Sequence, residues 1–277
     1  MLLPATKDGI VGAMLSPLLA NLVAIAALVP ATLFALRPNA ARDGLFWGGA
    51  CLAALGAGLW SWMLLSGGWH SQFGTVVWVI VAASAVLFLP VAFFARQAWR
   101  LAPLLMPYLL SLAVFASVVR GEKRPLPTDA PAVWIDVHIL VAVLLFGLLT
   151  LAAVSSFAVF LQEKALKRKR PGPLTPMLPS VADAERLAGW LLMGSETVLG
   201  IGVITGMAIE YFATGALLRF DHKTLFFITA FVLIGALLLG HRVCGVRGRM
   251  AARVVLLAYL LVMLASPGVK FVTQVLR

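Results

Sequence analysis

Apolar segments of about 20 residues recur along nearly the whole of this 277-residue chain. A helix of that length crosses the roughly 30 Å hydrocarbon core of a bilayer. Because the chain is 62% apolar and only 12% charged, little of it is left for a soluble domain. We therefore predict an all-α integral membrane protein, a single transmembrane domain of eight helices. The predicted spans are residues 14–36, 44–66, 74–95, 101–119, 133–162, 187–213, 223–241 and 252–274.

The positive charges predict how these spans are oriented. The net charge is +11, yet the lysines and arginines concentrate in short connections between apolar segments. This distribution is typical of a topology signal and not of a nucleic-acid-binding patch. The densest connections, around residues 37–42, 96–100, 164–186 and 242–253, are assigned to the inner side of the membrane. Both termini are then expected outside.

The longest polar connection, residues 163–186, combines a run of basic residues with four prolines. Ser180 followed by Asp183 predicts a capped start for the helix that leads into the sixth span. The connection is typical of a solvated linker. The alternative is a docking surface for an acidic lipid headgroup or for a partner protein.

Two of the four histidines flank the seventh predicted span. The 18 residues between His222 and His241 rise about 27 Å in a helix, so their imidazoles are expected near opposite faces of the bilayer. His70 and His138 join His222 on the outer side, and neutral imidazole is a common axial ligand of haem iron. Other metals are disfavoured because no carboxylate or thiolate accompanies these histidines at ligand spacing. His241, alone at the inner side, is either a further ligand or a residue that reaches toward the headgroups.

Trp134 lies four residues before His138, so the two side chains are expected on one face of a helix. A flat indole beside an imidazole suits a porphyrin ring. The alternative is that Trp134 belongs to the belt of aromatic residues at the membrane interface.

Glu196 lies ten positions into the sixth predicted span. A carboxylate inside the membrane is costly and usually functional, so Glu196 could couple proton movement to the transport of a small solute. If the sixth span begins later than predicted, Glu196 is instead an interfacial residue.

Four motifs in the second half of the chain occur together. They are Asp136-Val137-His138, His222-Lys223-Thr224, an H-x-x-x-G-x-R-G-R pattern from His241 to Arg249, and Gly268-Val269-Lys270-Phe271. With the count of spans, they resemble the membrane-integral cytochrome c assembly family. The resemblance covers residues 133–277 and is strongest to the CcsA-type proteins, especially their shorter HemX-like and YpjD-like relatives.

This resemblance implies that the protein handles haem. In the larger members of the family, outer and intramembrane histidines bind haem that is presented to apocytochrome c. His138 is therefore expected as an outer ligand, His241 as an intramembrane ligand, and His222 as the histidine of the H-K-T motif. The resemblance also implies non-covalent haem b and a bacterial inner membrane location. The expected partners are membrane lipid and haem, together with either other cytochrome c assembly proteins or a haem-synthesis enzyme.

Two departures from the family pattern narrow this expectation. The tryptophan-rich haem-presenting motif of the synthetases is absent, and Val246 stands where the family has tryptophan. These differences favour a non-enzymatic accessory protein that handles or delivers haem in c-type cytochrome assembly. The alternatives are a membrane regulator that binds a haem-synthesis enzyme through residues 163–186 and the transporter noted above.

Overall fold

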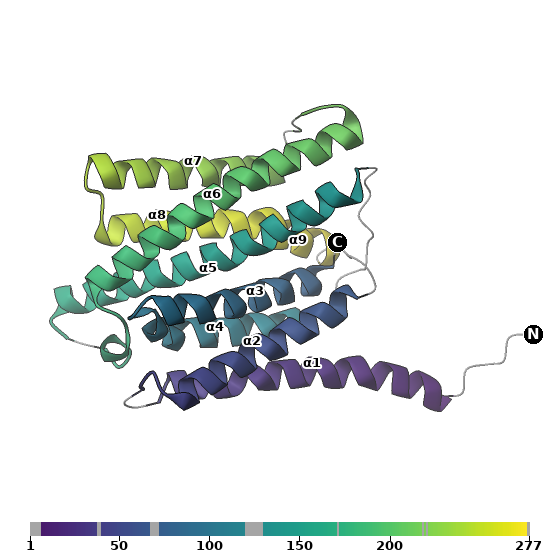
Figure 1. Ribbon diagram of the computed structural model, residues 1–277, viewed down its shortest axis with the longest axis horizontal. Helices are drawn as coiled ribbons and strands as arrows, with labels where there is room; N and C mark the ends of the chain where they lie inside the picture. Colours follow the sequence, from purple (N-terminus) through teal and green to yellow (C-terminus); the bar gives the residue numbers. More distant parts are fainter. Residues whose placement is uncertain are drawn as a thin grey trace, which may run out of the picture.

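All regular structure in the described residues is helical, and eight helices are long and apolar enough to cross a membrane (Figure 1). The computed structural model describes residues 7–37, 40–66, 72–119, 130–170, 172–217, 219 and 221–275. The helices are α1 (Lys7–Ala35), α2 (Gly44–Leu65), α3 (Phe73–Phe94), α4 (Ala102–Val118), α5 (Ala132–Arg168), α6 (Val181–Thr214), α7 (His222–Val243) and α8 (Gly248–Met263). The all-α prediction is confirmed, and so is the predicted number of helices apolar enough to span a membrane. The outward placement of the termini stays a prediction.

Short helical segments complete two of the spans. A 3₁₀ turn, Ala98–Leu101, leads into α4, and a π-helical segment, Leu264–Gly268, joins α8 to α9 (Val269–Val275). Pro267 lies inside the π segment. Proline cannot donate a backbone hydrogen bond and clashes with the preceding turn of an α-helix, so the change of winding is expected at this residue.

Helices α5 and α6 are longer than predicted. They contain 37 and 34 residues, or about 55 Å and about 51 Å, so several turns extend beyond a bilayer core of roughly 30 Å. The hydropathy pattern marks where the apolar stretch stops, whereas the helical backbone continues through the polar residues that follow. The predicted cap is confirmed, because the Ser180 hydroxyl accepts the backbone N–H of Asp183 at the start of α6.

Helix α5 lies in the middle of the bundle (Figure 1). It packs against α3 on one side and against α6 and α8 on the other. Helices α1, α2 and α4 pack on the α3 side, while α7 lies at the opposite edge against α6 and α8. The helices of the second half of the chain, α5 to α9, therefore pack mainly against one another.

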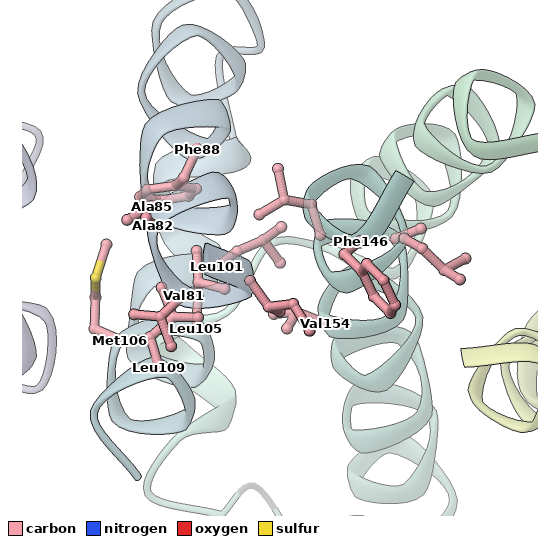
Figure 2. Close-up of a cluster of buried hydrophobic side chains, with 14 of the residues drawn as sticks. Val81, Ala82, Ala85, Phe88, Leu101, Leu105, Met106, Leu109, Phe146 and Val154 are labelled. Atoms are coloured by element: carbon pink, nitrogen blue, oxygen red, sulfur yellow. The ribbon is translucent and has the colours of Figure 1, made fainter. Parts of the chain in front are cut away.

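The centre of the bundle is a close-packed apolar cluster drawn from α3, α4 and α5 (Figure 2). Phe88 of α3, Leu105 of α4 and Leu149 of α5 are fully buried. Gly147 lets α5 approach α3, because a Cβ at this position would come within 3.2 Å of the Ala83 backbone. In lipid, where apolar surroundings remove most of the hydrophobic driving force between helices, such close backbone contact is a principal source of association.

Candidate functional site

A first cavity in the C-terminal half has a volume of about 420 Å³, within the range of small-molecule sites. It lies between α5, α6 and α7, with further residues from α3, the π segment and α9. Most of its walls are apolar, formed by valine, isoleucine and leucine together with Phe146 and Phe227. In such an apolar cavity, the few polar side chains are the groups that can fix the orientation of a ligand.

His138 is the imidazole that lines this cavity, from the second turn of α5. Its Nδ1 lies 2.9 Å from the hydroxyl oxygen of Thr205 on α6, and that hydroxyl donates to the carbonyl oxygen of Gly202 at 3.1 Å. A hydroxyl carries one hydrogen, so Thr205 accepts from His138 and the network assigns the imidazole proton to Nδ1. The Nε2 atom of His138 is left with its lone pair, which is the form that binds a metal.

Helix α6 makes room for this imidazole with a glycine. A Cβ at Gly206 would lie 3.4 Å from His138 Cε1, so a larger side chain would press on the ring. Sequence analysis missed both Thr205 and Gly206. Small residues at Gly202 and Gly206, four apart and so on one helix face, are the signal that could have indicated the close α5–α6 contact.

Cationic side chains from separate segments line the same cavity. Arg219 precedes α7, Lys223 comes from the H-K-T motif, and Lys270 comes from the G-V-K-F motif on α9. Ser266 of the π segment also lines the cavity and lies one helical turn before Lys270. The H-K-T and G-V-K-F motifs, which are far apart in the chain, therefore both reach the first cavity. Each places one cationic side chain in its otherwise apolar lining.

Asp221 and Glu210 add acidic groups to the cavity lining. Asp221 caps α7, because its carboxylate accepts the Thr224 N–H at 2.8 Å. Burial raises the pKa of Asp221, but this hydrogen bond and the charges of Lys223 and Arg219 outweigh it, and the pKa falls below its usual value. Asp221 therefore stays ionised and balances part of the positive charge.

The other predicted ligands do not line this cavity. His222 is exposed at the start of α7, although its neighbours Asp221 and Lys223 line the chamber. Trp134 is 38% exposed, and its indole packs against Phe212 of α6 with ring centroids 6.4 Å apart. Within the described residues, no three or more histidine, cysteine, aspartate or glutamate side chains cluster as a metal site. His70 lies outside the described residues.

His241 lies at the other end of α7 and lines a second cavity of about 460 Å³ between α6, α7 and α8. Its Nδ1 is 3.0 Å from the carbonyl oxygen of Val246. A carbonyl only accepts, so His241 also carries its proton on Nδ1. The imidazole thereby closes the turn between α7 and α8, and its Nε2 lone pair is not used by that bond.

The H-x-x-x-G-x-R-G-R pattern forms this turn. Gly245 and Gly248 adopt φ angles of +65° and +66°, which glycine reaches without strain. At the start of α8 the Gly248 N–H donates to Glu185 Oε1 at 2.6 Å, and the Arg249 N–H donates to Glu163 Oε2 at 3.2 Å. Two carboxylates from α5 and α6 thus satisfy the unpaired N–H groups of the helix.

Glu196 lies near the middle of α6, between the two cavities along that helix. Helix α6 begins at Val181, earlier than the predicted span, but it is longer than a bilayer core, so its start does not place Glu196 relative to the membrane surface. The Oε2 atom of Glu196 is buried and has no hydrogen-bond partner. A buried, unpartnered carboxylate oxygen in a long apolar helix is a costly arrangement.

Comparison with known proteins gives two matches and one negative result. The sequence model of the family described as Cytochrome C assembly protein matches residues 47–277. A protein of Azospirillum brasilense described as "Uncharacterized 28.8 kDa protein in nifR3-like 5'region" is 50% identical over 262 residues, covering 92% of this chain and 97% of the relative. No solved structure matches the chain.

Proposed function

We propose, since the chain belongs to the cytochrome c assembly protein family, that it binds haem b without covalent attachment and delivers it as an accessory of c-type cytochrome assembly. Membership of the family suggests a role in the biogenesis of c-type cytochromes. The more specific proposal treats haem as cargo, held in the first cavity. The membrane in question is the bacterial inner membrane.

The observation that carries this proposal is the hydrogen-bonded state of His138. Its Nδ1–H is committed to Thr205, so its Nε2 lone pair is available to iron at the wall of an apolar cavity. Ligating histidines usually donate their second ring N–H in this way, which holds the ring in place and makes it a better ligand.

The rest of the cavity suits the two ends of a haem molecule. Apolar walls are compatible with the macrocycle, and haem carboxylates need cations at the edge of their site. Arg219, Lys223 and Lys270 supply that charge. The lining provides one imidazole, so His138 is the axial ligand of this proposal, and the roles of His222, His241 and Trp134 as further haem contacts stay predictions.

Absorption spectroscopy of the detergent-solubilised protein tests the assignment. The protein titrated with haem is expected to show a Soret band, and His138→Ala is expected to weaken haem binding at least tenfold, because it removes the ligand. His222→Ala tests the separate prediction for this exposed histidine, which does not line the cavity: binding like the wild type would leave His138 as the ligand, and a loss would make His222 a haem contact as well. A protein that stays colourless in excess haem, or a His138→Ala variant that binds like the wild type, would contradict the proposal.

Glu196 favours a second candidate function, proton-coupled transport of a small solute. Its buried, unpartnered oxygen near the middle of α6 is the kind of group that carries protons in membrane transporters. Vesicles containing the protein would then show solute uptake driven by a proton gradient, and Glu196→Gln would abolish it. Unchanged uptake in Glu196→Gln would remove this candidate.

A further inference from the structure

Three arginines line the second cavity, and they come from separate parts of the chain. Arg186 lies in the first turns of α6, Arg242 near the end of α7, and Arg247 immediately before α8. Within the described part of the chain, no carboxylate lies within ion-pair distance of any of them. Glu185, the acidic residue of the lining, already accepts the Gly248 N–H. Three arginines thus outnumber the one carboxylate of the lining, and the opening carries a net positive charge.

The same cavity has an apolar side that continues onto the surface of the bundle. Trp190, Met193 and Leu238 line it, and the Trp190 side chain is 69% exposed. Leu239, next along α7, is 64% exposed. Tryptophan is enriched where the hydrocarbon core of a bilayer meets the headgroups. A ligand in this cavity thus meets cations at one end and lipid-facing apolar surface at the other.

The position along α7 agrees with such a boundary. Helix α7 has 22 residues and spans about 33 Å, close to the roughly 30 Å of a bilayer core. Arg242 follows the apolar run of α7 that ends at Gly240, so the cationic rim is expected at a membrane surface. The apolar walls, starting at Leu237 and Leu238, extend from that surface into the hydrocarbon region.

We propose that the second cavity binds the phosphate headgroup of an anionic phospholipid. Arg186, Arg242 and Arg247 contact the headgroup, because guanidinium groups pair with phosphate oxygens through two parallel hydrogen bonds. The acyl chains lie along Trp190 and Leu238 on the surface between α6 and α7. Basic pockets between transmembrane helices are known to select anionic headgroups in this manner. Free phosphate would contact only the arginines and would leave the apolar side of the cavity empty. A phospholipid contacts both, so we assign a lipid as the occupant.

Native mass spectrometry of the full-length protein tests this site with phosphatidylglycerol as the probe and phosphatidylcholine as the zwitterionic comparison. The wild type is expected to retain phosphatidylglycerol selectively. Each substitution of Arg186, Arg242 or Arg247 by glutamine is expected to weaken retention about fivefold, the scale of one cation near an anionic headgroup. The triple variant Arg186→Gln, Arg242→Gln, Arg247→Gln is expected to lose selective retention, and the single variants keep the test decisive if this triple variant does not fold.

The matched control is the triple variant Lys164→Gln, Lys167→Gln, Arg168→Gln. It removes the same charge from the exposed end of α5, on the same predicted side of the membrane, and leaves the cavity intact. It is expected to retain phosphatidylglycerol like the wild type. An equal loss in this control would show diffuse surface attraction and would overturn the proposal.

Further arms separate the other occupants. Glycerol 1-phosphate, which has the headgroup charge without acyl chains, is expected not to displace the lipid, and full displacement would indicate a simple anion site instead. Haem titration of the arginine variants is expected to match the wild type. Loss of haem binding with unchanged lipid retention would identify the second cavity as a haem site and would refute the lipid assignment.

Discussion

Glu196 on α6 lies directly against Gly235 on α7, so that a Cβ added at Gly235 would come within 3.0 Å of the Glu196 Oε1 atom. The glycine makes the space that the carboxylate occupies. The second oxygen of the same carboxylate is buried without a partner. Stability alone would favour an apolar side chain at this position, so the carboxylate is retained at a cost to the fold.

Replacing Glu196 with methionine is expected to raise the free energy of unfolding by about 1 kcal/mol, because it removes an unsatisfied buried oxygen and keeps the volume. Unfolding in detergent measures the change.

A double-mutant cycle tests the contact between the two residues. Gly235→Ala is expected to destabilise the wild type and to be harmless in Glu196→Ala, where the space beside Gly235 is free. Unfolding in detergent measures all four proteins of this cycle. Additive effects of the two substitutions would contradict the contact.

Thr205→Val is expected to weaken haem binding about 10- to 100-fold, because it removes the acceptor that orients His138 and fixes its proton on Nδ1. Thr205→Ser retains the hydroxyl and should bind haem like the wild type. Haem titration followed in the Soret band makes the comparison. Equal binding by Thr205→Val and Thr205→Ser would show that the Thr205 hydroxyl has no role in ligation.

The two glycines of the α7–α8 turn offer a matched pair. Both have positive φ angles, and a Cβ at Gly245 meets nothing within 4 Å, whereas one at Gly248 would collide with the Glu163 carboxylate. Gly245→Ala is expected to cost about 1 kcal/mol from backbone strain, and Gly248→Ala is expected to cost roughly 3 kcal/mol because it also displaces Glu163 from the Arg249 N–H. Thermal unfolding midpoints should rank the variants in that order. Equal shifts of the unfolding midpoint in the two variants would contradict a collision between a Cβ at Gly248 and the Glu163 carboxylate.

A hydroxyl pair joins three helices away from the cavities. The hydroxyl groups of Tyr108 on α4 and Tyr259 on α8 are 2.5 Å apart, and the Tyr259 hydroxyl lies 3.3 Å from the Thr150 hydroxyl on α5. Thr150 donates its single hydrogen to the Phe146 carbonyl at 2.6 Å, so it accepts from Tyr259. Tyr259→Phe is expected to cost roughly 2 kcal/mol, because it leaves two partners unsatisfied, and Tyr108→Phe about 1 kcal/mol. Unfolding in detergent measures the difference, with exposed Tyr211→Phe as the control. A larger loss of stability in Tyr108→Phe than in Tyr259→Phe would contradict the central position of Tyr259 between Tyr108 and Thr150.

The cap of α7 is expected to depend on pH. The pKa of Asp221 is lowered in the folded protein, so its stabilising effect is present above its unfolded pKa of about 4 and is lost as the pH falls through the lower folded value. Asp221→Ala is therefore expected to cost about 1 kcal/mol at pH 7 and progressively less below pH of about 4. Unfolding at several pH values tests this, with exposed Asp136→Ala as the control. A gap between Asp221→Ala and wild type that widens in acid would contradict the assigned direction.

Much of the site could be located from the sequence, though its internal arrangement could not. The H-K-T and G-V-K-F motifs both reach the first cavity, but Lys223 and Lys270 line it while His222 does not. Thr205 and Gly206 were missed because neither belongs to a motif and both sit in an otherwise apolar helix. Their importance depends on His138, which is about 70 residues away along the chain and adjacent only in the folded protein.

The sequence by itself determined that this chain forms eight helices able to cross a membrane, and that His138, His222, His241 and the basic motifs lie close to helix ends. Span length and hydropathy are local properties, so they can be read along the chain. Only the tertiary structure decided that His138 lines a cavity beside Thr205 while His222, on a neighbouring helix, is exposed. The reason is that transmembrane helices are apolar on every side, so hydropathy does not indicate which face meets another helix. That choice comes from the fit between side chains, in which small residues such as Gly206 decide where two helices approach.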